Sequence, residues 1–309
     1  MDIQPITEAN IAPVWELYQR SVVELDRIPL DWFKFKVLGD PDADPSLSLV
    51  ALDSGKPVGF MVGVARRTEG GLEGFLKVWA TDGSHRDKGI AKSLYQCIED
   101  RLRELGAGGF DKLTAGKIGV GYSRPNYITP GIDAGAYTPA VGFLLRRGFK
   151  YIGMNYNMDV PLSGRTFRDP DLEARLAAQG ITARRLGKDE ADRFISWMPE
   201  DGWSPGWQYQ VRTASEAEPT AVFIAEKESR YVGFAVYDGV RPGWFGPMGT
   251  SEEMRGTGIG SVLLFKCLED MRDKGYPICR ICAVGPLYFY SKVIAAVVTR
   301  TFWLMEKEL

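Results

Sequence analysis

The sequence is poor in metal-binding side chains: its 309 residues include four cysteines and one histidine, His85. Zinc sites normally need about four ligands, so we expect no metal centre. Cys279 and Cys282 form a Cys-x-x-Cys pair in a segment typical of a strand. Residues three apart on a strand face opposite sides, which argues against a shared metal or redox site. Cys97 and Cys267 fall on predicted helices, where core packing is the better interpretation.

Strong charge and long apolar runs are also absent. The formal net charge is −2 and there is no lysine- or arginine-rich block, so we expect no basic surface for nucleic acid. No uninterrupted apolar run approaches the ~20 residues of a membrane-spanning helix. Residues 1–6 lack the basic segment and apolar core of a signal peptide. These absences favour a cytoplasmic protein that acts without nucleic acid or membrane.

What the sequence does contain is one plan of elements, repeated in two halves. Residues 49–62 and 221–236 each read as a strand, a polar turn and a second strand containing Val-Gly-Phe, which is the pattern of a β-hairpin. A further strand follows at Phe75–Thr81 and at Trp244–Thr250. A glycine-containing loop and a run with apolar residues at three- and four-residue steps come next in both halves, which predicts an amphipathic helix.

The chain is long enough for two ordinary domains. Residues 161–170 contain two prolines, a glycine and several polar residues, a composition typical of a linker. We therefore expect an N-terminal domain at residues 1–160, a linker at 161–178 and a C-terminal domain at 179–309.

The two loops contain the most informative stretches, Arg86-Asp-Lys-Gly-Ile-Ala91 and Arg255-Gly-Thr-Gly-Ile-Gly260. The first N–H groups of a helix have no internal partner and lie at the positive end of the helix dipole, so such a loop can bind phosphate. Glycines let the backbone approach the anion closely. A P-loop is excluded because no Gly-Lys pair is followed by serine or threonine. A dinucleotide fingerprint is excluded because Ser261 stands where its third glycine is required.

Both loops fit the remaining pattern, Arg/Gln-x-x-Gly-x-Gly/Ala at the start of a helix, and here the chain resembles the GNAT N-acetyltransferase superfamily in tandem form. The resemblance covers nearly the whole chain. It implies an α+β fold of two tandem GNAT-like domains, each with a mixed, mostly antiparallel sheet flanked by helices. It also implies acetyl-CoA as co-substrate, with its pyrophosphate held by loop amides. The implied cofactor-binding residues are Arg255, Gly256, Thr257, Gly258, Ile259, Gly260 and Ser261 in the second half, and Arg86, Lys88, Gly89, Ile90 and Ala91 in the first.

In this family the strand before the loop splays from its neighbour and pairs with the pantetheine arm, which implicates Met248, Gly249 and Thr250. Two residues depart from the pattern. Glu252 stands where many relatives have proline, and Asp87 replaces a glycine and adds negative charge beside the first-half site.

The resemblance further implies a catalytic tyrosine. Acetyl transfer to an amine needs a proton for the leaving thiolate, and a phenol can supply it. Family members often carry this tyrosine in a late Phe-Tyr phrase, which Phe289-Tyr290 matches, whereas Leu144 occupies the place in the first half. We therefore expect the second half to be catalytic, with Tyr290 as general acid. The first half would be structural, regulatory or substrate-shaping. A packed aromatic is the alternative interpretation of Tyr290.

Two segments are candidates for contacts to the acceptor. Residues 200–209 are rich in aromatic and acidic side chains, and form either a wall for a cationic amine or an aromatic lid over the core. Residues 123–137 form a long Gly/Pro loop that either lines a cleft or faces the other half. His85, in the loop entry, is interpreted as a solvated or capping residue. The pattern does not identify a general base.

The expected function is transfer of an acetyl group from acetyl-CoA to an amine of a small molecule. A protein-amine acetyltransferase is the nearest enzymatic variant. The rival from another class is a non-catalytic acyl-CoA-binding sensor or regulatory protein. The sequence does not identify the acceptor or the oligomeric state, for which a homodimer is the candidate.

Overall fold

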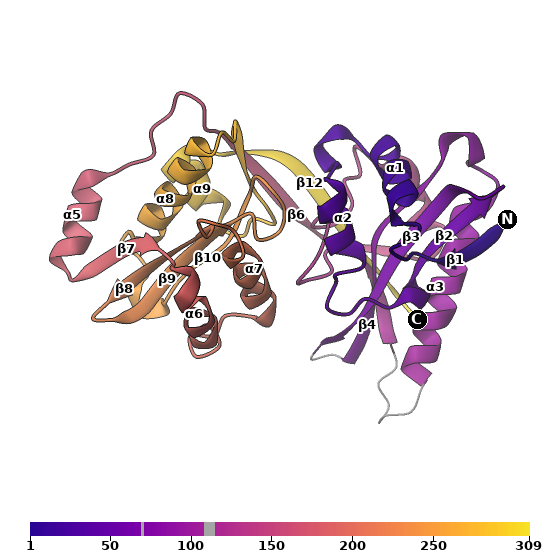
Figure 1. The fold of residues 1–309 in the computed structure, drawn as a ribbon, viewed down its shortest axis with the longest axis horizontal. Helices are drawn as coiled ribbons and strands as arrows, with labels where there is room; N and C mark the ends of the chain where they lie inside the picture. The colour runs from indigo at the N-terminus through magenta and orange to yellow at the C-terminus, as the bar shows by residue number, and fades with distance from the viewer. Residues whose placement is uncertain (69–70, 108–114) are drawn as a thin grey trace. The chain divides into compact units, whose positions relative to one another are not determined.

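A computed structural model describes residues 1–68, 71–107 and 115–309 of the chain (Figure 1). The chain divides into two compact units. Unit 1 comprises Met1–Asn155 and Thr301–Leu309, and unit 2 comprises Tyr156–Arg300. Among the described residues, no helix has both the length and the apolar character needed to cross a bilayer.

Unit 1 is built on a sheet of strands β1 to β5, closed by the end of β12. The β4–β5 pair is parallel and the other described pairs in this unit are antiparallel. Its elements are β1 (Asp2–Pro5), α1 (Ile11–Ser21), η1 (Glu24–Asp26), α2 (Leu30–Val37), η2 (Pro45–Leu47), β2 (Ser48–Asp53), β3 (Lys56–Thr68), β4 (Gly71–Thr81), η3 (Gly83–His85), α3 (Ile90–Ala107), β5 (Ala115–Val120), α4 (Thr138–Leu145) and the start of β6 (Lys150–Pro161).

Unit 2 repeats this plan, with the sheet order β7-β8-β9-β10-β11 closed by the end of β6. Here β10 and β11 form the parallel pair. The elements are α5 (Pro170–Ala178), β7 (Ile181–Arg185), η4 (Lys188–Glu190), α6 (Ala191–Trp197), α7 (Pro205–Ser215), β8 (Val222–Lys227), β9 (Arg230–Tyr237), β10 (Trp244–Thr250), η5 (Glu252–Met254), α8 (Ile259–Asp273), β11 (Ile278–Ile281), α9 (Leu287–Ile294) and β12 (Val297–Glu308). The predicted α+β class is confirmed, since strand pairing in each unit is mixed and mostly antiparallel and helices accompany the strands.

In each unit, the last strand beside the parallel pair is the end of a long strand that begins in the other unit. The end of β12 pairs antiparallel with β5 of unit 1, and Met305 on it is buried in that unit's core. The end of β6 pairs antiparallel with β11 of unit 2, and Met158 and Val160 are buried in the second core. The expected domain boundary at residue 160 differs from this arrangement. The end of β6 belongs to unit 2 and the end of β12 belongs to unit 1, because their buried side chains pack in those cores.

The expected linker at 161–178 also differs from what the structure contains. Residues 170–178 form α5, which begins with Pro170 and is capped by Asp169, whose carboxylate accepts a hydrogen bond from Leu172 N at 2.9 Å. Leu172 and Leu176, four residues apart on one helix face, are buried in the second core. The proline and polar residues therefore mark a helix start within unit 2.

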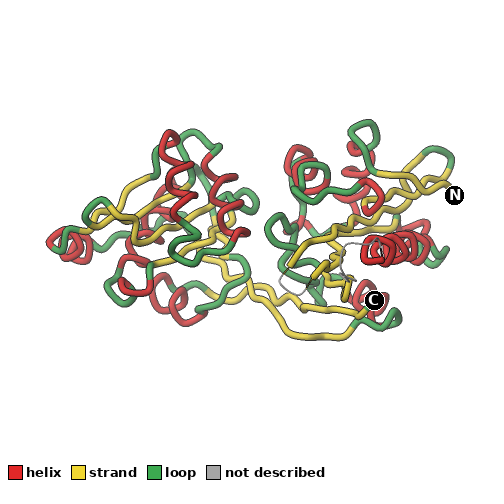
Figure 2. Tube along the Cα trace, turned by 90° about the horizontal axis from the view of Figure 1, so that it is seen from below, coloured by secondary structure: helices red, strands yellow, loops and turns green. Residues whose placement is uncertain are grey.

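In unit 1, helices cover both faces of the sheet (Figure 2). Tyr18 of α1 and Phe33 of α2 pack with Phe60 on one face. Leu94 of α3 packs with Met61 on the other face. Adjacent residues of β3 thus point into different cores, as alternation along a strand requires. The α1 side and the α3 side of the sheet are the two sides on which the site is built.

Candidate functional site

The first-half site begins where β4 and β5 separate. Their parallel pairing ends at Leu76↔Val120, yet β4 continues to Thr81 and stays paired with β3 over that length. In residues 77–81 of β4, the backbone N–H and C=O groups that face β5 are therefore not paired with that strand. A strand edge of this kind can pair with another extended chain, because each residue carries a donor and an acceptor.

The loop after β4 has the geometry that the sequence predicts for an anion site. Asp87 and Gly89 both have left-handed backbone conformations, with φ of 61° and 80°. Aspartate tolerates this region better than most residues, so Asp87 does not distort the loop. Helix α3 begins directly afterwards, at Ile90. Within the described chain, the N–H groups of residues 87–92 have no hydrogen-bond acceptor, as expected at an open helix N-terminus.

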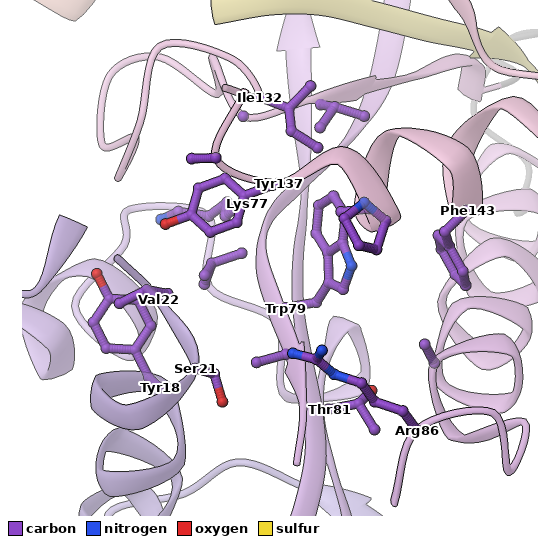
Figure 3. A pocket seen from close by; sticks show the side chains of 18 of the residues that line it. Tyr18, Ser21, Val22, Lys77, Trp79, Thr81, Arg86, Ile132, Tyr137 and Phe143 are labelled. Carbon is purple, nitrogen blue, oxygen red and sulfur yellow. The ribbon is translucent and has the colours of Figure 1, made fainter. Parts of the chain in front are cut away.

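A cavity of about 730 Å³ adjoins this loop and the separated strands. The volume lies within the range of small-molecule and cofactor sites. Its lining includes Tyr18 and Val22 from the α1 side of the sheet, and Phe143 of α4 from the α3 side. Figure 3 shows Trp79 of β4 between Tyr137 on one side and Phe143 on the other. The cavity therefore reaches both sides of the sheet at the split between β4 and β5.

The charged groups along the cavity differ between its two sides. Arg86 and Lys92 line it at the loop and the first turn of α3, Arg147 lines it just after α4, and Asp87 adds one carboxylate at the loop. These cations lie with the free loop amides, which suits an anionic ligand. On the α1 side lies Asp26, which is 2% exposed and whose Oδ2 accepts a hydrogen bond from Tyr137 Oη at 2.5 Å.

Lys77 lies at the start of the separated segment of β4. It is the extra residue of a bulge, since Val62 pairs with Val78 and Gly63 pairs with Leu76. Its ammonium group is fully buried and donates to the Lys36 carbonyl and to Asp40 Oδ2. Burial lowers the pKa of Lys77 to about 8, against the opposing pull of Asp40.

The second half repeats the backbone of this site. Pairing of β10 with β11 ends at Phe245↔Ile281, while β10 continues to Thr250 beside β9. Gly256 and Gly258 have φ of 81° and 102°, the same left-handed pair as in the first loop. Helix α8 then begins at Ile259. The predicted strand, loop and helix are therefore present in both halves.

Side chains, however, occupy the space beside the second loop and strand. A Cβ atom on Gly258 would lie 2.5 Å from Leu172 Cδ1, and one on Gly249 would lie 2.5 Å from Trp203 Cη2. A Cβ on Gly260 would lie 3.2 Å from Met248 Cε. By contrast, a Cβ on Gly89 in the first loop would meet nothing within 4 Å. A Cβ on Gly256 in the second loop would also meet nothing within 4 Å. In the described ranges, the N–H groups of residues 256–260 likewise have no backbone acceptor. The two loops differ at Gly258, where Leu172 packs closely, whereas no side chain packs against Gly89.

Tyr290 lies on α9 and is 5% exposed. Its ring makes edge contacts with Phe245 and Phe289. Burial raises the pKa of Tyr290, so the phenol is protonated at neutral pH. These features suit a proton donor, but Tyr290 as general acid stays a prediction.

The two segments expected to contact the acceptor lie in different environments. Trp203 and Trp207, from residues 200–209, stack on each other and contact Phe234 of β9, which is the packing expected of an aromatic lid on the second core. Residues of the 123–137 loop line the first-half cavity, Tyr137 among them. Sequence reasoning had singled out that loop but not Asp26, Lys77 or Trp79, which have no local signature. His85, beside Ser84 and Asp53, also lines the cavity.

Comparison with known families confirms the resemblance. A model described as the acetyltransferase (GNAT) family matches residues 11–117 and 188–286, more than half of the chain. This chain belongs to the GNAT acetyltransferase family. Each matched region contains one of the two loops. A comparison with curated proteins found no match.

Solved structures share the tandem fold of this GNAT protein. A GCN5-related glucosamine N-acetyltransferase region of a fungal multi-domain GH3 β-N-acetylglucosaminidase superposes with a TM-score of 0.77 at 17% identity. That match covers 99% of this chain but only 38% of the fungal chain. A tandem GNAT protein from the clavulanic acid biosynthesis pathway has a TM-score of 0.67 at 13% identity, over 99% of this chain and 98% of that one. A GCN5-related N-acetyltransferase from Sphaerobacter thermophilus has a TM-score of 0.65 at 17% identity, and the match covers 99% of this chain and 95% of that one.

Proposed function

We propose that the protein is an acetyl-CoA-dependent N-acetyltransferase whose cofactor site is the cavity of the first half. The observation that carries this proposal is an open ring of loop amides, residues 87–92, directly beside a cavity at the separated strands β4 and β5. Membership of the acetyltransferase family supports the class of reaction. This assignment moves the reaction away from Tyr290.

Residues of the first half fit acetyl-CoA by their chemistry. The N–H groups of residues 87–92 and the Arg86 guanidinium suit its pyrophosphate. The free edge of β4 at residues 78–81 suits the amide groups of the pantetheine arm. Bound there, acetyl-CoA supplies a thioester whose carbonyl carbon reacts with an amine. Trp79 and Tyr137 line the cavity beside this edge.

The acceptor that we propose is a small-molecule amine. Thr129, Ile132 and Tyr137 of the 123–137 loop line the cavity, whose volume of about 730 Å³ suits a small acceptor. The second half, where Leu172 packs against Gly258 and Trp203 packs against Gly249, would then support the fold without performing transfer. A non-catalytic acyl-CoA sensor predicts binding of acetyl-CoA without release of the CoA thiol across a broad amine panel. Our proposal predicts release with at least one amine.

Charge reversal at the two equivalent arginines tests which half holds the cofactor. Arg86→Glu should weaken CoA binding about 10- to 100-fold, because it replaces a charge-assisted contact with repulsion of the phosphates. Arg255→Glu is the matched control, and Arg255 is 64% exposed with an ion pair to Glu252 at 3.7 Å. It should leave the dissociation constant unchanged. Calorimetric titration of CoA measures both, with one site per chain expected. The reverse pattern would assign the cofactor to the second half.

Tyr290→Phe tests the competing site. If transfer occurs in the first half, the variant should retain the turnover of the unmodified enzyme. A general acid at this position would instead contribute roughly 10²- to 10⁴-fold to the rate. Turnover is measured as CoA thiol release at saturating acetyl-CoA. A loss of two orders of magnitude, with folding unchanged by circular dichroism, would return the reaction to the second half.

A further inference from the structure

The first-half cavity gives the two reactants different entrances, and this step rests on the proposed function. The open amides of residues 87–92 lie on the α3 side of the sheet. Tyr18 and Val22 line the cavity from the α1 side, beyond the split between β4 and β5. A thioester delivered through the split from the α3 side therefore meets its acceptor on the α1 side.

A buried carboxylate occupies that α1 side. Asp26 ends the short η1 turn and is 2% exposed while lining the cavity. Tyr137, from the opposite wall, donates its hydroxyl to Asp26 Oδ2 at 2.5 Å and accepts the Val23 N–H at 3.2 Å. Tyr18 donates its hydroxyl to the Asp26 carbonyl. Tyr137 thus positions the carboxylate at the cavity wall, and Tyr18 fixes the backbone of the same residue.

We propose that Asp26 is the recognition and proton-accepting group for the acceptor, which is a small primary amine bound as its ammonium ion. A carboxylate with little exposure to water favours a cation over a neutral group of the same shape. Val22, which also lines the cavity, is apolar, and the Lys77 ammonium in the lining is already paired with Asp40. Tyr137 is a positioning residue, since it acts by orienting the carboxylate.

The transfer balances with this assignment. The ammonium group gives one proton to the Asp26 carboxylate, which frees the nitrogen lone pair. The nitrogen–carbon bond to the acetyl group forms and the carbon–sulfur bond of the thioester breaks. A second proton leaves the nitrogen for the sulfur, which yields the amide and the CoA thiol. Asp26 then returns its proton to water.

The test compares Asp26→Asn with Glu24→Gln, which removes the same charge from an exposed position of the same turn. The probes are glucosamine, tyramine and spermidine, with glucose and tyrosol as neutral counterparts of the first two. CoA thiol release gives KM for each amine, and calorimetry gives Kd for CoA. Asp26→Asn should raise the amine KM about 10- to 100-fold and lower kcat, with the Kd for CoA unchanged. Glu24→Gln should leave the amine KM and kcat unchanged.

Tyr137→Phe provides a second variant in case Asp26→Asn does not fold. It should raise the amine KM while retaining CoA affinity, because only the orientation of Asp26 is lost. An unchanged amine KM in both variants, or equal inhibition by tyrosol and tyramine, would overturn the inference. Binding of CoA with no turnover of any cationic amine would also overturn it and leave the cofactor site standing. Failure of the unmodified protein to bind CoA would instead refute the proposed function itself.

Discussion

Replacing Gly89 with valine should abolish measurable binding of CoA. Gly89 has φ of 80°, a conformation that a β-branched residue adopts only with strain. Valine should therefore shift the loop out of the shape that directs the amides of residues 87–92 into one space. Loss of two or more charge-assisted hydrogen bonds, at about 1.5–3 kcal/mol each, weakens binding by roughly 100-fold or more.

Gly83→Val is the matched control for this substitution. Gly83 lies in the same loop, is exposed, and has an ordinary backbone angle. A Cβ on either glycine would meet nothing within 4 Å, so neither valine causes a clash. Gly83→Val should keep the CoA affinity within about threefold of the unmodified protein. Equal affinity of the Gly89 and Gly83 variants by calorimetry would contradict a cofactor site at this loop.

The local elements of both halves could be predicted from the sequence because their signals are local. Glycine at positions 89 and 258 anticipates a left-handed turn, and both residues have it. The hairpins, the strands before the loops and the helices after them follow from apolar periodicity and turn residues. The family pattern spans the same short stretches, so the resemblance and the fold class were both accessible from sequence.

The difference between the two sites could not be predicted, because it depends on side chains distant in sequence. Leu172 covers Gly258 from 86 residues away in the chain, and Trp203 covers Gly249 from another loop. No propensity specifies which helix packs against a given loop. The sequence favoured the second half because Tyr290 matches the family phrase where the first half has Leu144, and because Asp87 replaces a glycine in the first loop. The contact between Leu172 and Gly258 has no counterpart at Gly89 and is visible only in the structure.

The exchange of closing strands escaped prediction for a similar reason. Alternating apolar residues in β6 and β12 predict strands, but not the core that receives Val160 or Met305. Asp26 was missed because an isolated aspartate carries no motif. Its significance arises only when Tyr137, 111 residues later, donates a hydrogen bond to it.

Asp40→Asn should produce the largest loss of stability among single substitutions around the cavity. Asp40 has a side chain with no exposure and accepts two hydrogen bonds from the Arg66 guanidinium at 2.8 Å and one from Lys77. Burial acts to raise the pKa of Asp40, but these partners together lower it. Removing its charge leaves two buried cations without their shared anion. Breaking a buried ion pair in this way costs about 3–5 kcal/mol of unfolding free energy.

Asp42→Asn is the control for that substitution, since Asp42 also pairs with Arg66 but is 46% exposed, and its loss should cost about 0–1 kcal/mol. Urea unfolding followed by circular dichroism measures both variants.

The lowered pKa of Asp40 also predicts how stability depends on pH. The contribution of the Asp40 carboxylate to the free energy of unfolding is complete above pH 3.8, and it is lost as the pH falls through the folded-state pKa. The Asp40 variant should lack this acid-side loss. If Asp40→Asn and Asp42→Asn unfold at the same urea concentration, the Lys77 bulge is not held by this ion pair, and the shape of β4 must come from backbone pairing alone.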